Sequence, residues 1–354
     1  MKVGILTFHR ANNYGAVLQC YAFQQYLKAL GLDVEVIDYR QPIIEKTYRV
    51  FSIAKFLKLL LHPVGAVQYI IGISRRLRRS YEFKKFRKNH ISVSPRPFFG
   101  KGQLDYDIVF HGSDQIWNPK LLGGKMDDIY LGFYKLKANA DKVAYAVSFE
   151  DKSISNDVIK KFQEGLNNFS AISLREESLV KHLVPLTDKK INIVVDPTLL
   201  LSRNEFDQIA TYKKMKKKYV LLYAVGPMTL ALKLAKRIAF ERNLNLINIT
   251  NKDISPSLFI GYIKQAEFVV SVSFHGTVFS LLYNKNFYTI ATGMASDVRY
   301  YDLLRNFHME DRCITYMPEQ ITAIDYSDFN LLKYKYVQPS INFIKDCCLS
   351  IQDK

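Results

Sequence analysis

The first part of the chain alternates between short apolar runs and a helical pattern. Residues 2–7 and 34–39 are mostly apolar, and apolar residues recur at helical spacing between them, over residues 16–30. Gly31 follows, and glycine commonly ends a helix. A strand, a helix and a second strand in this order form a βαβ unit, so we expect a parallel sheet from the start of the chain.

The same alternation continues along most of the chain. Further runs typical of strands lie at 106–110, 143–147, 171–174 and 193–195, with helical patterns at 156–168 and 178–183. After a linker with five lysines, residues 212–218, predicted strands lie at 219–224, 246–249, 268–271 and 287–290 and predicted helices at 231–242, 257–265 and 277–283. We therefore predict an α/β protein of two Rossmann-like, doubly wound domains, residues 1–211 and 212–354, that face each other across a cleft.

An insertion at residues 42–97 interrupts this alternation. Its apolar part, residues 53–73, contains too many polar and charged positions to span a membrane. Residues 74–90 carry eight Arg and Lys residues against one acid, with aromatic residues among them. Such a stretch is usually a solvated helix face, but it can also lie on an anionic membrane or bind nucleic acid. The adjoining apolar part favours an anionic membrane surface, contacted through residues 53–90, and with no recognised nucleic-acid motif we expect no nucleic acid partner.

The composition agrees with a folded protein that has anionic partners. Hydrophobic residues make up 48% of the 354 positions, which argues against disorder, and the formal net charge of +17 favours ligands that carry phosphate or carboxylate groups. The four cysteines lack metal-ligand spacing and suggest a reducing compartment. Since the N-terminus also lacks a signal-peptide pattern, we expect a cytoplasmic protein, peripheral at the inner face of the plasma membrane if the basic stretch binds lipid.

The strongest local feature is the segment S-V-S-F-H-G-T at residues 271–277, which follows a predicted strand and opens a predicted helix. Gly276 permits close approach of the backbone, and Ser273 or Thr277 can cap the helix. His275 would then lie beside unpaired backbone N–H groups that can bind an anion, and histidine suits proton transfer near neutral pH. A histidine that only caps or packs is the competing interpretation, and from residue type alone it is the more common case.

Two arginines follow predicted strands in a similar way. Arg175 comes directly after residues 171–174, and Arg299 comes after residues 287–290. The guanidinium group can hold a carboxylate or a phosphate with two parallel hydrogen bonds. A surface ion pair with a neighbouring glutamate is an equally good account of Arg175, and a solvated arginine at a helix start is the commoner account of Arg299.

The segment H-G-S-D-Q-I-W-N-P at residues 111–119 also leaves a predicted strand. Ser113 and Asp114 offer polar groups there, and Asp114 can accept a proton from a sugar hydroxyl. Trp117, the only tryptophan, can stack on a sugar ring, although a tryptophan that fills the core is the commoner case.

The loop after the first strand contains Asn12, Asn13 and Tyr14 and offers small polar groups on a flexible turn. It does not have the G-x-G-x-x-G spacing of a dinucleotide site. The chain also has no P-loop, no G-x-S-x-G elbow and no H-E-x-x-H motif. These absences leave several enzyme classes without support.

Taken together, these segments resemble the polysaccharide pyruvyl transferase family. The matching segments are K-V-G-I-L-T-F-H-R-A-N-N-Y-G-A-V-L-Q at residues 2–19, D-Y-D-I-V-F-H-G-S-D-Q-I-W-N-P at 105–119, A-Y-A-V-S-F at 144–149, S-L-R-E-E-S at 173–178, D-P-T-L-L-L at 196–201 and S-V-S-F-H-G-T-V-F-S at 271–280. Each is weak by itself, but they occur in order over most of the chain, and together they are specific to the family.

The resemblance implies a fold like that of the type B glycosyltransferases, with the acceptor on the side of the first domain and the donor on the side of the second. It implies transfer of a pyruvyl group from phosphoenolpyruvate to a sugar of a surface polysaccharide, often lipid-linked, without a metal or an organic cofactor. Arg175 would bind the donor anion, His275 would be the general acid, and Asp114 matches the family's acidic residue. The expected catalytic residues are thus His275 and Asp114, and the expected substrate-binding residues are Arg175, Arg299, Ser273, Gly276, Thr277, Asn12, Asn13, Tyr14, Ser113 and Trp117.

Two positions depart from the family pattern. Ser273 stands where many members carry an arginine, two residues before the histidine, and Glu150 stands where a glycine is expected. Arg299 is our candidate for the missing arginine. Two alternatives to the pyruvyl transferase remain from the sequence: a sugar-nucleotide-dependent glycosyltransferase of the same fold, and a non-catalytic scaffold at the membrane surface.

Overall fold

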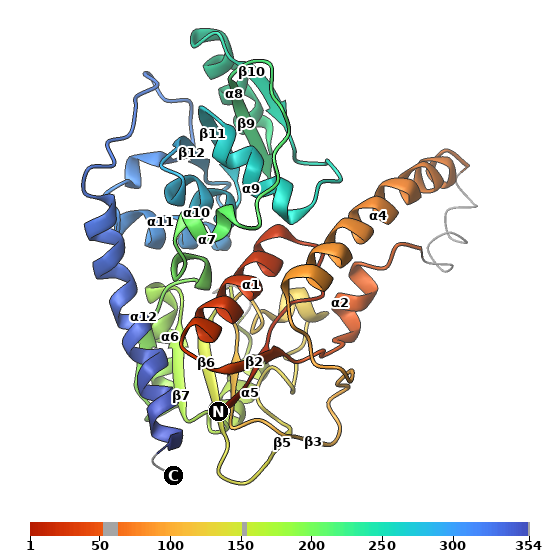
Figure 1. Cartoon of the computed structure of the whole chain (residues 1–354), viewed down its shortest axis with the longest axis vertical. Helices are drawn as coiled ribbons and strands as arrows, with labels where there is room; N and C mark the ends of the chain where they lie inside the picture. Colours follow the sequence, from red (N-terminus) through yellow and green to blue (C-terminus); the bar gives the residue numbers. More distant parts are fainter. Residues whose placement is uncertain (52–62, 151–153, 353–354) are drawn as a thin grey trace.

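The computed structural model describes residues 1–51, 63–150 and 154–352 (Figure 1). The first half of the chain forms a parallel sheet in the order β2-β1-β4-β6-β7-β8. Its strands are β1 (Lys2–Leu6), β2 (Asp33–Val36), β4 (Ile108–His111), β6 (Asp141–Val147), β7 (Ala171–Leu174) and β8 (Ile191–Ile193), and β3 (Gln103–Leu104) pairs separately with β5 (Lys135–Leu136). The predicted parallel sheet is therefore confirmed.

The second half forms a second parallel sheet in the order β10-β9-β11-β12-β13. Its strands are β9 (Tyr219–Ala224), β10 (Asn245–Asn248), β11 (Phe268–Val272), β12 (Asn286–Ile290) and β13 (Cys313–Ile314). Helices fill the connections, namely α1 (Tyr14–Ala29), α2 (Pro42–Thr47), α4 (Pro63–His90), α5 (Asn156–Leu166), α6 (Val180–Leu183), α7 (Arg203–Asp207), α8 (Thr229–Glu241), α9 (Pro256–Gln265), α10 (Phe274–Leu282), α11 (Val298–Arg305) and α12 (Phe329–Gln352). The predicted pair of Rossmann-like domains is confirmed.

Each sheet has one point at which the strand order reverses. In the first sheet, β1 lies between β2 and β4, and in the second sheet β9 lies between β10 and β11. Loops that leave two such strands diverge to opposite faces of the sheet and leave a crevice at the carboxyl ends, where ligands of doubly wound proteins bind. The loops after β1, β4, β9 and β11 are therefore the places where the topology favours a site.

The ends of helix α1 explain why Asn13 and Gly31 stand where they do in the sequence. The side chain of Asn13 caps the helix by accepting a hydrogen bond from the backbone N–H of Ala16, at 3.3 Å. The helix ends at Ala29, and Gly31 adopts a φ of 79°, the left-handed conformation in which glycine is the preferred residue. The predicted helix is confirmed and begins two residues earlier than its apolar pattern indicated.

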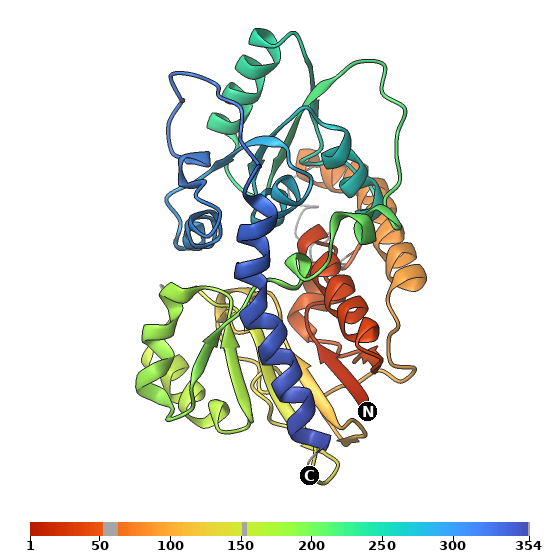
Figure 2. The same cartoon turned by 60° about the vertical axis from the view of Figure 1, so that its left-hand side comes forward.

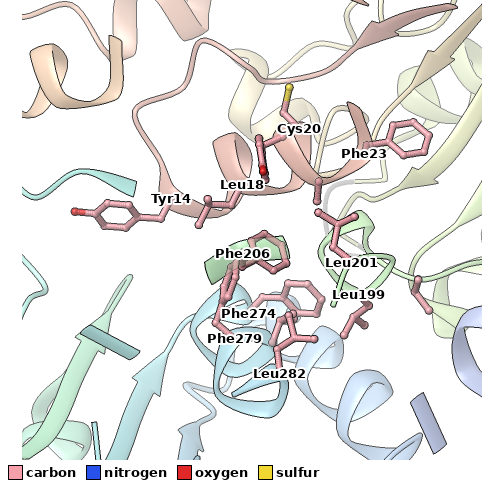
Figure 3. Packing of buried hydrophobic residues seen from close by; sticks show 14 of the residues in the cluster. Tyr14, Leu18, Cys20, Phe23, Leu199, Leu201, Phe206, Phe274, Phe279 and Leu282 are labelled. Carbon is pink, nitrogen blue, oxygen red and sulfur yellow. The ribbon is translucent and has the colours of Figure 1, made fainter. Parts of the chain in front are cut away.

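An apolar layer joins the two domains on one side of the cleft. Figure 3 shows Tyr14 and Leu18 of α1 facing Phe274 and Phe279 of α10, with Phe206 of α7 between them. Tyr14 also donates a hydrogen bond to the carbonyl oxygen of Ile254 in the second domain, at 3.2 Å. This contact fixes the start of α1 against the loop between β10 and α9.

The last helix departs from the predicted division of the chain. Residues 212–354 were assigned to the second domain with a C-terminal tail, but α12 runs back along the first domain (Figures 1 and 2). Its Ser340 hydroxyl accepts a hydrogen bond from the Val195 N–H at 2.8 Å, and Phe343 and Ile344 are buried. The apolar face of α12 therefore completes the core of the first domain, a long-range contact that local sequence patterns do not reveal.

The insertion at residues 42–97 contains α2 and α4. Residues 53–62 of the predicted membrane-binding stretch lie outside the described residues. The basic part of α4 turns Phe83 and Phe86 into the core and leaves Leu77 and Tyr81 exposed. Among the described residues, none of the helices combines the length and the apolar character needed to span a bilayer.

Candidate active site

A pocket of ≈ 340 Å³, here called the central pocket, lies between the two domains at both points of strand reversal. The loops after β1 and β4 contribute Asn13 and Asp114, and the start of α10 contributes its N-cap Ser273 and His275. The first turn of α11 contributes Arg299. The structure thus brings together five residues that the sequence analysis named separately. They come from two domains and lie up to 286 positions apart, counting from Asn13 to Arg299.

His275 fits closely against the first domain. The backbone of Gly15, in the first turn of α1, approaches the imidazole ring so closely that a methyl group on Gly15 would collide with Nδ1. On its other side, His275 Nε2 lies 3.4 Å from Oδ2 of Asp196, a buried first-domain residue. The ring is therefore held by two neighbours from the opposite domain, and the role of Gly15 is to leave room for it.

Asp196 belongs to a buried ionic network behind the pocket wall. Arg175 donates one hydrogen bond from Nη1 to Asp196 Oδ2 and one from Nε to Glu176 Oε1, both at 2.8 Å. Burial raises the pKa of Asp196, but His275 and Arg175 outweigh this effect and hold it well below its usual range. Burial lowers the pKa of Arg175, and the charges of Glu176 and Asp196 more than reverse that effect. Both groups are therefore ionised.

Asp196 links this buried network to the ring of His275. Arg175 supplies one positive charge, and Glu176 and Asp196 together supply two negative charges. The network without His275 therefore carries one more negative than positive charge, and the carboxylate of Asp196 faces the imidazole ring. The arrangement is suited to a general acid that delivers a proton into the central pocket and recovers it afterwards.

Asp114 lies in the loop after β4, on the first-domain side of the central pocket. Its backbone adopts a φ of 75°, an uncommon conformation for a residue other than glycine and one that often marks functional positions. Its Oδ1 accepts a hydrogen bond from the N–H of Gln115 at 2.9 Å. Burial and the nearby charge of Asp114 raise the pKa of Tyr48, which also lines the pocket. The carboxylate can accept a proton from a bound hydroxyl group.

Arg299 brings a positive charge to the wall of the central pocket formed by the second domain. Its Nε donates to the carbonyl oxygen of Ser296 at 3.0 Å, and the side chain is half-buried. Thr292 and Ser296 line the pocket beside it. This group of side chains can bind a carboxylate or a phosphate.

The sequence analysis expected Arg175 to bind the donor directly, but Arg175 does not line the central pocket. Its side chain is only 2% exposed and packs behind Phe274, with the guanidinium carbon 4.5 Å from the ring centroid. Phe274 itself lines the pocket. The two carboxylates that pair with Arg175 explain this placement, since they stabilise a guanidinium group that burial would otherwise penalise.

Four other predicted residues are buried away from the pocket. Trp117 is fully buried among aromatic rings and donates from Nε1 to the carbonyl oxygen of Tyr130. It is therefore a core residue and does not stack on a sugar, which corrects that expectation. Ser113 donates to the carbonyl oxygen of Ala146 and to Asp196, which makes it part of the buried network. Gly276 and Thr277 are buried inside α10 and direct their N–H groups to Ser273, so they do not present an anion site to the pocket.

Asn12 and Tyr14 lie beside the central pocket. The carbonyl oxygen of Asn12 accepts hydrogen bonds from the guanidinium group of Arg79, and its side-chain oxygen accepts one from Arg87. Tyr14 stacks on Phe259 of the second domain, with ring centroids 4.5 Å apart. Both residues therefore shape the loop that carries Asn13, and neither lines the central pocket.

The sequence model of the polysaccharide pyruvyl transferase family matches residues 13–293, well over half of the chain. The chain belongs to this family. The matched region contains Asn13, Asp114, Asp196 and His275, whereas Arg299 lies just beyond it. The curated proteins contain no match to the chain.

Solved structures give weaker likenesses. A functionally uncharacterised protein from Klebsiella pneumoniae is 15% identical, with a TM-score of 0.44 over 69% of this chain and 88% of that one. A heptosyltransferase from E. coli with ADP is 11% identical, with a TM-score of 0.38 over 98% and 100%. A UDP-GlcNAc 2-epimerase from Neisseria meningitidis bound to UDP-GlcNAc is 10% identical, with a TM-score of 0.43 over 97% and 100%. Likenesses at this level carry no argument about activity.

In this member of the polysaccharide pyruvyl transferase family, Ser273 has a structural role at the start of α10. The Ser273 hydroxyl caps α10 by accepting from the N–H of Gly276, and Arg299 lines the same pocket from a different element. Asp196, which contacts both His275 and Arg175, is the residue that the sequence analysis did not name as part of a site, although it directly follows the predicted strand 193–195. An acidic residue at a strand end, in the same position as Arg175 and Asp114, was the available signal.

Proposed function

We propose that this protein transfers the pyruvyl group of phosphoenolpyruvate to a sugar and forms a cyclic ketal, with the reaction in the central pocket. The main support is the meeting of His275, Asp114 and Arg299 in one interdomain pocket. These groups supply an acid, a base and a cation, the three functions that the reaction needs. Membership in the polysaccharide pyruvyl transferase family supports the same reaction class.

The proposed chemistry follows from the positions of these groups. His275, in its protonated form, transfers a proton to the methylene carbon of phosphoenolpyruvate, and C2 becomes electron-deficient. A sugar hydroxyl attacks C2 and passes its proton to Asp114. The bond between C2 and the phosphate oxygen then breaks, and a second hydroxyl of the sugar closes the ketal. The sugar loses two hydroxyl protons in total. This number balances the one proton that the methyl carbon gains and the one proton that leaves with the phosphate.

The remaining residues position these groups. Arg299 neutralises the carboxylate or the phosphate of the donor, and closing the site between two rigid domains lowers the entropic cost of bringing donor and acceptor together. Arg175 and Asp196 act through His275, because Arg175 holds Asp196 and Asp196 faces the imidazole ring. The first domain binds the acceptor near Asp114, and the second domain binds the donor near Arg299.

The test is phosphate release from phosphoenolpyruvate by the purified protein with a panel of galactose-, glucose- and mannose-type glycolipid acceptors. We expect release that depends on one acceptor, together with a product whose mass has increased by one pyruvyl ketal. A His275→Gln variant should lose about 10²–10⁴-fold in turnover, the usual contribution of a general acid. Tight binding of a sugar nucleotide without any turnover of phosphoenolpyruvate would instead support the glycosyltransferase alternative, and binding of neither would support a scaffold.

We further propose that α4 contacts an anionic membrane surface, where a lipid-linked acceptor would be found. Its exposed face carries Arg78, Lys84, Lys85 and Lys88, next to the exposed Leu77 and Tyr81. The triple change of Lys84, Lys85 and Lys88 to Glu should abolish co-sedimentation with vesicles that contain phosphatidylserine. The same change at Lys213, Lys214 and Lys216 in the exposed linker alters net charge equally and is the control. Equal losses in both variants would mean that net charge alone is responsible.

A further inference from the structure

A second pocket, here called the α4 pocket, opens beside the central pocket. Its volume is ≈ 550 Å³, and three arginines of one helix, Arg75, Arg76 and Arg79, line one wall. The opposite wall comes from the second domain, at the ends of β9 and β10. Asn13, Tyr48 and Val225 line both pockets, so the two hollows adjoin each other along the domain interface.

The α4 pocket carries an excess of positive charge. The acid among its lining residues is Asp253, and its carboxylate lies 3.8 Å from Arg75 Nε, near the outer limit of an ion pair. Three guanidinium groups thus face one carboxylate. Arg75 and Arg79 are one helical turn apart, a spacing at which like charges repel each other. A bound anion with more than one negative charge would relieve this repulsion.

The three arginines differ in how firmly they are held. Arg79 donates from Nε and Nη2 to the Asn12 carbonyl oxygen and stacks on the rings of Tyr14 and Phe83, so it supports the loop after β1. Arg76 donates from Nε to the Val50 carbonyl oxygen at 3.0 Å, and the side chain of Arg75 is 62% exposed. Arg75 and Arg76 are therefore the two arginines of this wall that do not hold the loop after β1, and Arg75 is the more exposed of them.

We infer that the α4 pocket binds a phosphate or diphosphate group carried by the acceptor, while the acceptor's sugar reaches Asp114 and His275 in the central pocket. This inference rests on the proposed function. Planar guanidinium groups match the oxygens of phosphate with paired hydrogen bonds. The shared lining residues let one molecule occupy both hollows, so charge recognition and the reaction take place on different walls of one interface.

A binding measurement with inorganic pyrophosphate tests the pocket independently of catalysis. Calorimetric titration should show that the Arg75→Gln/Arg76→Gln variant binds pyrophosphate about tenfold or more weakly than the parent, because it loses two charge-assisted contacts. The Lys213→Gln/Lys214→Gln variant is the matched control, because it removes the same number of charges from the exposed linker, and neither lysine is among the residues that line the pocket. Equal binding by the arginine variant and the lysine control would overturn the inference, as would a loss that appears only with Arg299→Gln.

Two further ligands distinguish the source of the phosphate group. One is a short-chain alkyl diphosphate ester of the accepted sugar, compared with the phosphate-free alkyl glycoside, and the other is a UDP-sugar. We expect the arginine variant to raise the KM for the diphosphate ester about tenfold, with the KM for the glycoside and for phosphoenolpyruvate unchanged. If only the UDP-sugar depends on Arg75 and Arg76, the pocket is a nucleotide site and the inference is wrong. Pyrophosphate binding that depends on the arginines would survive even if no pyruvyl transfer were found, so the two proposals can fail separately.

Discussion

The surroundings of Arg175 and Arg299 show how differently one residue type can be used in two regions of the same cleft. Both arginines follow a strand, and both were expected to hold an anion. Arg175 is closed in by Glu176 and Asp196, with its side chain 2% exposed, whereas Arg299 is half-buried on the wall of the central pocket. The difference lies in the neighbouring acids, because an arginine whose charge is already matched has little to offer a ligand.

The largest expected effect comes from replacing Arg175, the arginine that is buried between two carboxylates. Arg175→Met would leave Glu176 and Asp196 buried without their shared cation, and breaking such a buried pair costs about 3–5 kcal/mol in the free energy of unfolding. Arg299→Met is the matched control and should change stability by only about 1 kcal/mol, because Arg299 is half-buried and donates to a backbone carbonyl oxygen rather than to a buried carboxylate. Urea denaturation measures both. Equal stabilities of the two variants would contradict the contrast between the two arginines.

The buried network also predicts how stability depends on pH. The pKa of Asp196 is depressed in the folded protein, so its ionised form stabilises the fold above the pKa of an unfolded aspartate, about 4, and this contribution is lost as the pH falls further. Thermal unfolding should therefore find the parent more stable than Asp196→Asn near pH 7. The gap should narrow below about pH 4, where the aspartate of the unfolded chain takes up a proton. A gap that is constant over this range would show that Asp196 acts only through its shape.

Gly15 links the first domain to the proposed acid. A methyl group at this position would meet the ring of His275, so Gly15→Ala should displace the ring while α1 remains helical. A misplacement of about 1 Å can cost about 100-fold in turnover. Steady-state kinetics should show a lower kcat and little change in the KM for phosphoenolpyruvate, and circular dichroism should confirm that the variant is folded. Unchanged turnover would mean that the position of the ring is not critical.

The parts of the fold that the sequence predicted are those governed by local patterns. Alternating apolar runs and helical spacing identified both sheets, and the ends of their strands identified His275 and Asp114. The sequence could not show which side chains are turned inward: Trp117 and Arg175 have surroundings that are made by residues distant in the chain. The path of α12 was missed for the same reason, since only tertiary contact with Val195 and Tyr145 reveals its partner.

The basic insertion illustrates the same limit. Its composition indicated a surface helix, and the exposed lysines of α4 agree with that expectation. Its sequence could not show that Arg79 and Arg87 reach the loop after β1, nor that Arg75 and Arg76 line a pocket with the second domain. Whether a charged side chain faces solvent or lines a site depends on what lies opposite it in the fold. For Arg75 and Arg76 the opposite wall belongs to the second domain, which the local sequence does not indicate.

The smallest expected effect concerns the arginine that remains available to a ligand. Arg299→Gln keeps a polar amide but shortens the side chain and removes its charge, so the donor should lose one charge-assisted contact, worth about 1.5–3 kcal/mol. The KM for phosphoenolpyruvate should rise by about 10-fold to 100-fold, the equivalent of that loss, while the free energy of unfolding stays near that of the parent. Arg299→Lys should recover part of the affinity, because it restores the charge without the paired donors. If the KM is unchanged in Arg299→Gln, the donor anion is held elsewhere. Arg175 would then be the candidate again, through a rearrangement that frees it from Asp196.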